Sequence, residues 1–511
     1  MTAGRSLVVL DFGGQYTQLI ARRAREARVF SVVLPPGAPR SEILRHNPAG
    51  LILSGGPQSV YEADAPHPTS DLLDLKLPTL GLCYGMQWLA HALGGRVVPE
   101  GREYGRAQAR ITADSPLFAG LEETQTVWMN HGDSVADPPA GFRVIARTES
   151  SAVAGFESQS RGIYAVQFHP EVRHTEHGAE ILNNFLFRIC GARADWTMAS
   201  FRQEQVERIR RQVPTGSVVC ALSGGVDSSV TAILLREALS SRVYPILVDH
   251  GLLRAQEAAQ VVEAFGHLDI GVRSVDASDL FLSRLSGVAD PEEKRRIIGR
   301  TFIEVFEKEA RSIPDARYLA QGTLYPDVIE SVSIKGPSAV IKTHHNVGGL
   351  PERLGLELVE PVRELFKDEV RQLGADLGLP REFLRRHPFP GPGLAVRIPG
   401  DVTREKVGLL QKADQIVLDE IRAAGLYDAI SQAFAVLLPV RSVGVMGDAR
   451  THEYVLAVRA VQTTDFMTAD WFRMPHEVLD RIAARVTREV RGINRVVYDV
   501  TSKPPATIEW E

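Results

Sequence analysis

The stretch Ser223-Gly224-Gly225-Val226-Asp227-Ser228-Ser229 decides how the middle of this chain folds. It follows the apolar run Val218–Leu222, which reads as a buried strand, and precedes Val230–Leu239, whose apolar spacing is typical of a helix. Glycines between a strand and a helix form a phosphate cradle, because successive N–H groups can point at an anion beside the positive end of the helix. The serine hydroxyl groups add further donors. The sequence therefore predicts a phosphate-binding loop.

This loop differs from a Walker A loop, since no Lys-Ser or Lys-Thr pair follows a G-x-x-x-x-G frame. Transfer of a γ-phosphoryl group in the manner of a kinase is therefore disfavoured. The string instead resembles the loop of the ATP pyrophosphatase (PP-loop) family, which cleaves ATP between the α- and β-phosphates and leaves an adenylylated substrate. The resemblance implies that Ser223 to Ser229 bind ATP and that Asp227 helps to hold magnesium. A turn of glycine and serine without function is the plain alternative.

The composition is that of an ordinary multidomain globular protein. The 511 residues are too many for one core, so two to four domains are expected, with 44% hydrophobic and 24% charged residues. A net charge of −5 gives no bulk attraction to nucleic acid or to an anionic membrane. Three cysteines argue against a disulfide framework, and we find neither a signal peptide nor an apolar run that could span a bilayer. We expect a cytoplasmic protein.

Four apolar runs in the first third predict a parallel sheet covered by helices. They are Leu7–Gly13, Val29–Leu34, Leu51–Leu53 and Thr79–Cys83, and segments of helical length separate them. We therefore expect an α/β domain here.

A cysteine with reactive surroundings follows the last of these runs. Cys83 lies between Gly81 and Gly85, before a predicted helix over Met86–Leu93. This is the steric pattern of a nucleophile elbow, and the positive end of the helix favours a thiolate. Cys190 and Cys220 are expected to be inert core residues.

A base for this nucleophile is predicted at His169. After an apolar strand, His169 and Glu171 are two positions apart and project to the same side of an extended chain, so that Glu171 can orient the imidazole. The turn Ser54–Pro57 offers the N–H groups of Gly55 and Gly56 as an oxyanion hole.

The motifs G-x-C-x-G-x-Q, S-G-G-P and F-H-P-E together resemble those of the class I (triad) glutamine amidotransferase family. The resemblance covers nearly the whole first third of the chain. It implies that Cys83 attacks the glutamine carboxamide, that a thioester forms, and that ammonia and glutamate are released. Tyr84 joins Gly55 and Gly56 in the implied oxyanion hole. Because several families share this module, it indicates that glutamine is the nitrogen source but does not indicate which molecule accepts the nitrogen.

The middle of the chain continues the strand and helix alternation. Val243–Val248 is predicted to be a strand, and it ends where a doubly wound sheet binds its ligand. Tyr318–Thr323 is predicted to be another strand leading into a turn, where Gly322 permits close approach of a planar base. Asp327 and Glu330 could hold magnesium, or could equally be a solvated helix start.

Two basic stretches of the middle part are candidates for phosphate contacts. Lys342–Pro351 has the composition of a lid that brings cations onto phosphates; a zinc site at its adjacent histidines is disfavoured, because no cysteine or carboxylate is at ligand spacing. Lys367 either reaches the pyrophosphate or is a surface charge. The charged run Pro291–Arg296 reads as a solvated helix face.

The clearest boundary is His387–Leu394, where three prolines and two glycines exclude a helix. Beyond it a helix over Val407–Ala424, a second helix over Pro475–Val490 and three apolar strands predict a small α+β domain. The expected fold is thus two α/β domains with mainly parallel sheets, residues 1–192 and 193–386, followed by an α+β domain, residues 387–511.

An amidotransferase, a PP-loop domain and a domain ending in S-K-P-P-A-T-I-E-W-E, in this order, resemble the glutamine-hydrolysing GMP synthetase family along essentially the full length. The lid K-T-H-H-N and the linker H-P-F-P-G-P-G are further specific features. The resemblance implies amination of xanthosine 5′-monophosphate (XMP), with ATP cleaved to AMP and pyrophosphate through an adenylyl-XMP intermediate. MgATP is then a co-substrate, no organic cofactor is needed, and the C-terminal domain forms a homodimer.

The same resemblance implies site residues beyond the phosphate loop. For ATP these are Val248, Gly322, Lys342 and Lys367, with Asp327 as a second magnesium ligand. For XMP they are Arg284, Gln432, Asp448, Lys503, Ile508 and Glu509, of which Arg284 lies in a stretch that matches loosely.

Two alternatives stay open. A glutamine-fed NAD synthetase would share the first two modules but would be expected to lack the S-K-P-P tail. A nucleotide-sensing protein without catalysis would not need Cys83, His169 and Glu171. RNA thiolation is a weaker option, because neither a basic stripe nor an extra sulfur-carrying cysteine is apparent.

Overall fold

The structure is a computed structural model, and it describes residues 5–69, 71–333, 355–446, 448–463, 466 and 468–511. The chain forms two compact units, Met1–Phe201 with Pro326–Lys335, and Arg202–Tyr325 with Gly336–Glu511. Helices α5 (Met198–Gln212) and α10 (Tyr325–Ser333) straddle the division between them. No helix in the described ranges has both the length and the apolar character needed to cross a membrane.

The first unit is built on a nine-stranded sheet. Its strands are β1 (Ser6–Leu10), β2 (Ser31–Leu34), β3 (Pro48–Leu53), β4 (Thr79–Leu82), β6 (Glu103–Ile111), β7 (Thr124–His131), β9 (Arg143–Arg147), β10 (Gly155–Ser158) and β11 (Ile163–Val166). The spatial order is β2-β1-β3-β4-β11-β10-β9-β6-β7, parallel from β2 to β11 and antiparallel beyond. Strands β5 (Arg96–Val98) and β8 (Ser134–Asp137) form a separate pair.

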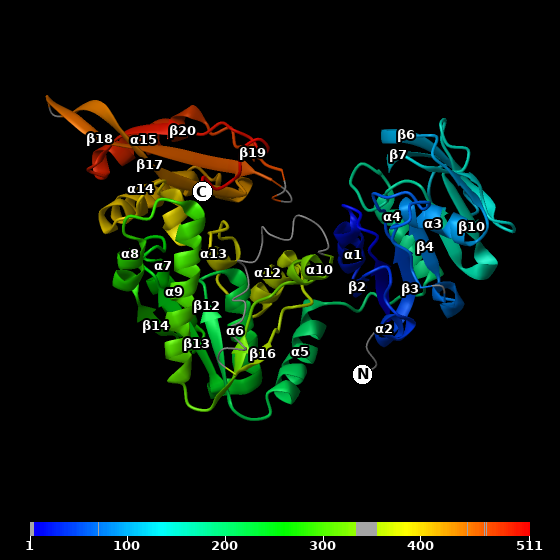
Figure 1. Ribbon diagram of the computed structural model, residues 1–511, viewed down its shortest axis with the longest axis horizontal. Coiled ribbons are helices and arrows are strands. Elements are labelled where there is room, and N and C mark those ends of the chain that lie inside the picture. Colours follow the sequence, from blue (N-terminus) through cyan, green and yellow to red (C-terminus); the bar gives the residue numbers. More distant parts are fainter. Residues whose placement is uncertain (1–4, 70, 334–354, 447, 464–465, 467) are drawn as a thin grey trace. The chain divides into compact units, whose positions relative to one another are not determined.

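Helices cover both faces of the parallel part, as Figure 1 shows for α1 and α3. They are α1 (Thr17–Glu26), α2 (Arg40–Arg45), α3 (Tyr84–Ala92) and α4 (Gly178–Asn183). Successive residues of a strand point to opposite faces, and in β1 Leu7 and Val9 pack with α1 and α4, whereas Val8 and Leu10 pack with α2 and α3. Burial on both faces explains why these strands read as continuous apolar runs.

The second unit contains a five-stranded parallel sheet in the order β14-β13-β12-β15-β16. Its strands are β12 (Ser217–Leu222), β13 (Val243–Asp249), β14 (Arg273–Asp276), β15 (Ala316–Ala320) and β16 (Glu357–Val359). Its helices are α6 (Val226–Leu239), α7 (Glu257–His267), α8 (Ser278–Leu285), α9 (Pro291–Arg311), α12 (Lys367–Asp376) and α13 (Arg381–Leu384). The phosphate loop joins the central strand β12 to α6.

A smaller sheet lies in the C-terminal part of the second unit. Strand β18 (Ala449–Gln462) pairs antiparallel with β17 (Gln432–Met446) and β19 (Asp470–Trp471), and parallel with β20 (Ile493–Tyr498). Helices α14 (Arg404–Ala423) and α15 (His476–Glu489) pack on it, and Figure 1 shows the long β17–β18 hairpin over α14. One apolar cluster runs from Val219 of β12 through α9 and α14 to Ile493 of β20.

The predicted fold class is confirmed, with parallel-rich sheets covered by helices and an α+β region at the C-terminal side. The proposed boundary between residues 386 and 387 lies inside the second unit. The linker is packed rather than free: a Cβ atom added at Gly393 would lie 2.4 Å from the carbonyl oxygen of Leu252.

The interpretation of Pro291–Arg296 as a solvated face is wrong for one residue. The side chain of Lys294 is 0% exposed. Its Nζ donates to the carbonyl oxygen of Ile398 at 2.8 Å and contacts Glu511 Oε2 at 2.5 Å. Charge content alone did not reveal this, because the partners come from more than 100 residues away.

Candidate active sites

Cys83 lies in a strained turn between β4 and α3. Its backbone has φ = +51°, a region that side chains other than glycine seldom adopt. Both flanking glycines are needed for space: a Cβ atom at Gly81 would lie 2.7 Å from the Gly85 carbonyl oxygen, and one at Gly85 would lie 2.3 Å from that of Leu53. The turn thus presents the thiol at the N-terminus of α3, as the sequence predicts for an elbow.

His169 and Glu171 meet after β11. Nδ1 of His169 lies 2.8 Å from Glu171 Oε1, and both side chains are at most 5% exposed. Burial alone would lower the pKa of His169, but the negative Glu171 and the neighbouring Cys83 outweigh it and hold the pKa well above its usual value. Apart from the neighbouring Cys83 thiol, Nε2 of His169 has no hydrogen-bond partner among the described residues.

The nucleophile, the base and the glycine turn surround one cavity of about 380 Å³. A Cβ atom at Gly55 would lie 3.1 Å from His169 Cε1 and 3.6 Å from Cys83 Cβ, so Gly55 lies beside both groups. Gly56 lines the same cavity. The N–H of Tyr84 belongs to the first residue of α3, where the helix itself supplies no acceptor. The geometry is suited to nucleophilic attack on a small carbonyl compound.

The cavity also contains His131, which lies outside the predicted site, and Gln87, the last residue of the G-x-C-x-G-x-Q motif. His131 is 4% exposed, its Nδ1 donates to the Asp133 carbonyl at 3.0 Å, and burial lowers its pKa, an effect strengthened by His169 and opposed by Glu103. The available signal for His131 was the polar run Asn-His-Gly-Asp directly after the apolar alternation of β7.

The phosphate loop follows β12 and is held by its own hydroxyl groups. Gly224 has φ = +75°, and α6 begins at Val226 with Gly225 as its N-cap. The hydroxyl of Ser228 accepts from the Ser223 N–H at 3.2 Å and donates to the Gly225 carbonyl at 3.2 Å. The positive end of a 14-residue helix therefore faces this turn.

Asp227 and Lys367 form an ion pair beside the loop, with Nζ 2.5 Å from Oδ2. The other oxygen, Oδ1, is buried without a hydrogen-bond partner among the described residues, which fits a role as ligand of a hard cation. A Cβ atom at Gly322 would lie 3.1 Å from the backbone of Asp227, so this glycine packs directly on the loop. Val248 lies near the carboxyl end of β13, on the same edge of the sheet.

A predicted magnesium ligand, Asp327, and a predicted ATP ligand, Lys342, are not placed beside the loop. Asp327, on α10, belongs to the first unit, so its relation to Asp227 stays a prediction. Lys342 and the rest of the predicted lid lie outside the described residues.

Predicted XMP ligands Gln432 and Glu509 lie together. Gln432 Nε2 donates to Glu509 Oε1 at 2.7 Å, and Arg397, whose side chain is 0% exposed, contacts both oxygens of Glu509 at 2.8 and 3.1 Å. Ile508 is buried, and its carbonyl accepts from Arg459 Nε at 2.7 Å. Arg397 and Arg459 could not be predicted as site residues, because an arginine in an apolar stretch carries no local sign of its partner.

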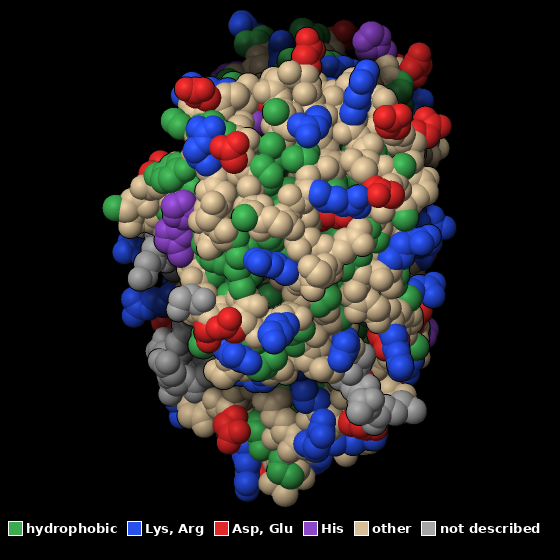
Figure 2. Space-filling model, turned by 90° about the vertical axis from the view of Figure 1, so that its right-hand side faces the viewer, with side chains coloured by type: hydrophobic (Ala, Val, Ile, Leu, Met, Phe, Trp, Pro, Cys, Tyr) green, Lys and Arg blue, Asp and Glu red, His purple; other side chains and the backbone are tan. Residues whose placement is uncertain are grey.

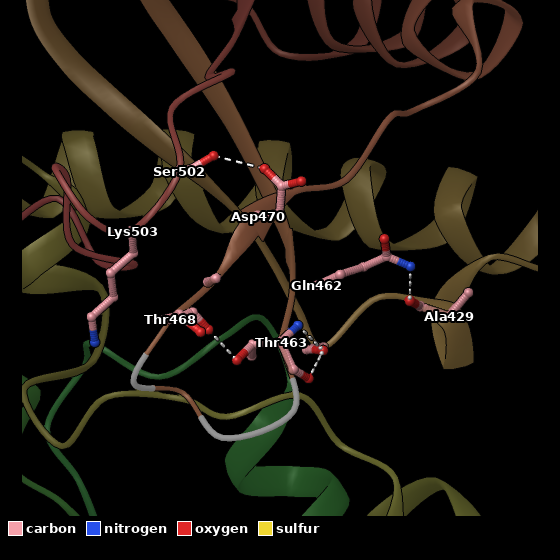
Figure 3. Close-up of a pocket in the computed structure, with 9 residues that line it drawn as sticks. Ala429, Gln462, Thr463, Thr468, Asp470, Ser502 and Lys503 are labelled. Atoms are coloured by element: carbon pink, nitrogen blue, oxygen red, sulfur yellow. Dashed lines mark hydrogen bonds between the residues drawn. The ribbon is translucent and has the colours of Figure 1, made fainter. Parts of the chain in front are cut away.

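Lys503 borders a second cavity of about 620 Å³ (Figure 3). Its Nζ donates to the Phe466 carbonyl at 2.7 Å. Next to Lys503, Ser502 and Asp470 point toward one another and bond at 2.7 Å. The walls offer hydroxyl, amide and carboxylate groups, a set suited to a polar ligand.

The structure does not bring the remaining two predicted XMP ligands to this cluster. Asp448 lies at the tip of the β17–β18 hairpin, and the 14 residues that separate Gln432 from Met446 correspond to roughly 40 Å of strand. Arg284, on α8, contacts Thr301 at 3.0 Å and Glu304 at 2.7 Å, both on α9.

Three protein families match successive parts of the chain. The class-I glutamine amidotransferase family matches residues 8–189, the NAD synthase family residues 200–295, and the GMP synthase C-terminal domain residues 419–510.

Curated relatives match along the full length. A glutamine-hydrolysing GMP synthase from Phenylobacterium zucineum (strain HLK1) is 58% identical and covers 99% of this chain and 98% of that protein. The protein of the same name from Carboxydothermus hydrogenoformans is 55% identical and covers 99% of each chain, and that from Nitratidesulfovibrio vulgaris (strain DP4) is 54% identical and covers 100% of each. On this similarity, the chain belongs to the glutamine-hydrolysing GMP synthase family.

Proposed function

We infer that the chain aminates XMP to GMP, with glutamine as nitrogen donor and ATP as co-substrate. This inference depends on one observation. A single chain, similar to GMP synthases along its full length, contains both a cavity lined by Cys83, His169 and Glu171 and a loop of glycine and serine at a helix N-terminus. The enzyme is a ligase that uses glutamine.

The first unit releases ammonia. Cys83 attacks the carboxamide carbon, and the oxyanion accepts hydrogen bonds from the N–H groups of Gly55, Gly56 and Tyr84. The protonated His169, stabilised by Glu171, gives its proton to the departing ammonia. It then acts as base for the water that hydrolyses the thioester to glutamate.

The second unit makes an oxygen of XMP a good leaving group. The C2 oxygen attacks the α-phosphate of ATP and pyrophosphate leaves; ammonia then adds at C2 and AMP departs, so that XMP, ATP and ammonia give GMP, AMP and pyrophosphate. The loop Ser223–Ser229, Gly322 and Lys367 bind the ATP, with Val248 at the strand end. Asp227 would hold a magnesium ion, which would supply positive charge to offset the negative charge of the pyrophosphate.

The acceptor nucleotide binds near Gln432, Lys503, Ile508 and Glu509. Asp448 is too distant within one chain, so its predicted contact requires a second copy that brings its hairpin tip to this cluster. We propose a homodimer formed by residues 387–511, and we retain residues 1–192 and 193–386 as the two catalytic domains of a cytoplasmic enzyme. The mixed positive and negative side chains on the face in Figure 2 suit small-molecule substrates better than nucleic acid.

The division of labour is tested by Cys83→Ala. Glutamine-dependent GMP formation is expected to fall at least about 1,000-fold, since the nucleophile is lost, whereas the rate with ammonium chloride stays within about twofold. The buried Cys190→Ala variant is the matched control. Loss of the ammonia-dependent rate in a folded Cys83→Ala enzyme would contradict two separate sites.

The product analysis tests the chemistry of the second unit. With XMP, glutamine and MgATP we expect AMP and pyrophosphate in equal amounts. Formation of ADP and orthophosphate would overturn adenylylation.

A further inference from the structure

Arg386 lies directly against the phosphate loop from the side of α7 and α13. Its Nη1 is 3.4 Å from the Gly224 carbonyl oxygen and 3.5 Å from Glu257 Oε1, and its Nη2 donates to Gln260 Oε1 at 3.2 Å. The guanidinium carbon lies 3.9 Å from the centroid of the Phe383 ring. Four groups from three elements therefore fix this side chain, which is 19% exposed.

The contact with Gly224 bears on the direction of a phosphate donor. The C=O of Gly224 and the N–H of Gly225 belong to one planar peptide group and point in opposite directions. A guanidinium that holds the carbonyl on the α7 side therefore leaves the Gly225 N–H on the opposite side of this peptide, where it donates to the hydroxyl of Ser223 in the same loop at 3.4 Å. A Cβ atom at Gly224 would lie 3.9 Å from Arg386 Nη1 and 3.6 Å from Glu257 Oε1, so both side chains lie close to this peptide.

The next residue, His387, connects Arg386 to Gln432 and Glu509, two of the proposed XMP-binding residues. Its ring stacks on Tyr427 at 3.9 Å with a 3° angle between the planes, and its Nε2 donates to the Tyr427 carbonyl at 3.0 Å. Its Nδ1 accepts from the N–H of Ala433 at 3.2 Å. Ala433 follows Gln432, whose side chain bonds Glu509.

Glu257 provides a second link in the same direction. Its Oε2 accepts from the N–H of Arg254 at 3.1 Å, and Arg254 in turn reaches Asp414 at 3.0 Å and the Ala433 carbonyl at 3.5 Å. The two peptide groups of Ala433 are thus held by His387, the chain neighbour of Arg386, and by Arg254, which donates to Glu257.

We propose that Arg386 is a positioning residue for the reaction: it orients the Gly224–Gly225 peptide toward the pyrophosphate and, through His387, fixes the loop relative to Gln432 of the acceptor site. This inference rests on the proposed role of Ser223–Ser229 in binding ATP. Arg386 acts through the loop and need not touch a substrate itself.

The test compares Arg386→Ala and Arg386→Lys with the matched control Arg385→Ala. Arg385 is the neighbouring residue, its side chain is 50% exposed, and it pairs with Asp428 on the surface. Initial rates of pyrophosphate release are measured with ammonium chloride as nitrogen donor, over a range of ATP concentrations at saturating XMP.

We expect the KM for ATP to rise about tenfold in Arg386→Ala, the size of one lost charged hydrogen bond, and to stay within about twofold of wild type in Arg385→Ala. Guanidinium ion at concentrations below those that unfold the enzyme should lower the raised KM of Arg386→Ala. Arg386→Lys should also show a raised KM, because a single ammonium group cannot reach the carbonyl and Gln260 together. The Arg386→Lys variant keeps the proposal testable if the Arg386→Ala variant does not fold.

An unchanged KM for ATP in folded Arg386→Ala or Arg386→Lys would overturn the proposal, as would a fall in kcat alone that guanidinium does not reverse. Asp227→Asn separates this outcome from failure of the proposed function. If Asp227→Asn stops pyrophosphate release while the Arg386 variants behave as wild type, only the role of Arg386 is wrong. If Asp227→Asn releases pyrophosphate at the full rate, the assignment of the loop to ATP is itself wrong.

Discussion

At the scale of single residues, the charge of Glu171 controls the protonation of His169. Folding raises the pKa of His169 despite its burial, so the folded chain binds a proton that the unfolded chain releases above pH of about 6.5. The stabilisation is fully present below that pH and is lost as the pH rises through the higher folded value. The same proton is the one that the departing ammonia receives in the proposed mechanism.

Replacing Glu171 by Gln should therefore lower the pKa of His169, because burial then acts without the opposing carboxylate. We expect glutamine-dependent synthesis to fall at least about 100-fold and ammonia-dependent synthesis to persist. Alkylation of Cys83 by iodoacetamide at pH 7 should slow, with little background from Cys220, whose pKa burial raises to about 12. The exposed Glu176→Gln in the same loop is the control, and an unaltered alkylation rate in Glu171→Gln would contradict the coupling.

The candidate site could be predicted from sequence where its residues are neighbours in the chain. Cys83 between two glycines and the pair His169 and Glu171 carry their geometry in their spacing. The sequence did not predict His131, Arg386 or Arg397 as site residues, because each of them makes its important contacts with residues on another element. Asp448 stays a prediction, since a motif that matches a family says nothing about the length of the strand that separates it from Gln432, and its contact requires a second copy.

At the scale of elements, β17 is an edge strand, since it pairs with β18 alone among the strands that the structure describes. Beyond its bulge it carries Val443 and Val445, which are 49% and 76% exposed. An exposed apolar edge favours pairing with another chain, and this supports the proposed homodimer.

Val445→Lys should dissociate such a dimer, because a lysine on the edge opposes strand pairing and its side chain is charged. We expect the mass from light scattering to fall from twice the chain mass to the chain mass, with unchanged circular dichroism. Leu44→Lys, at a 47% exposed leucine of the first unit, is the control. A Val445→Lys protein that keeps twice the chain mass would exclude this strand as the interface.

At the scale of the whole molecule, buried neutral histidines make the second unit sensitive to acid. Burial lowers the pKa of His250 and of His387 to about 4, although hydrogen bonds to backbone carbonyls oppose this at His387. Between about pH 6.5 and pH 4 the unfolded chain binds more protons than the folded chain, so stability falls as the pH falls. Protonation of His387 Nδ1 would also break its bond to Ala433.

Each of these two histidines should lower the free energy of unfolding of the second unit by about 2 kcal/mol when the pH falls from 7 to 5. In His250→Asn the amide oxygen can still accept from the N–H of Leu252, which His250 Nδ1 does at 3.1 Å, but no proton is bound. We expect this variant to lose less stability on acidification, measured by hydrogen exchange of the amides of β12 and β13. The exposed His267→Asn should behave as wild type, and an equal acid response in His250→Asn would refute the assignment.

The buried strands of the two parallel sheets could be predicted because their signal, like that of Cys83 and its glycines, lies in neighbouring residues of the chain. Strands buried on both faces, such as β1 and β12, read as unbroken apolar runs and were found in sequence. The antiparallel extension β6 to β10 was not predicted, because alternation such as that of Glu103–Ile111 is weak in apolar residues. The shared core of the second unit was also missed, since a proline-rich linker signals a break in helix and says nothing about packing on either side.

Residues 507–511 supply partners for three buried cationic side chains of the second unit. Lys294 and Arg397, each with a side chain that is 0% exposed, pair with Glu511 and Glu509. Arg459, whose ionic partner is Asp499, also donates to the carbonyl groups of Thr507 and Ile508. A buried charge without its partner is strongly destabilising. While a ribosome still holds residues 507–511 in its exit tunnel, the second unit therefore cannot complete its core. A stop codon just before Thr507 would release a chain whose second unit lacks the partners of Lys294 and Arg397 and is a substrate for proteolysis.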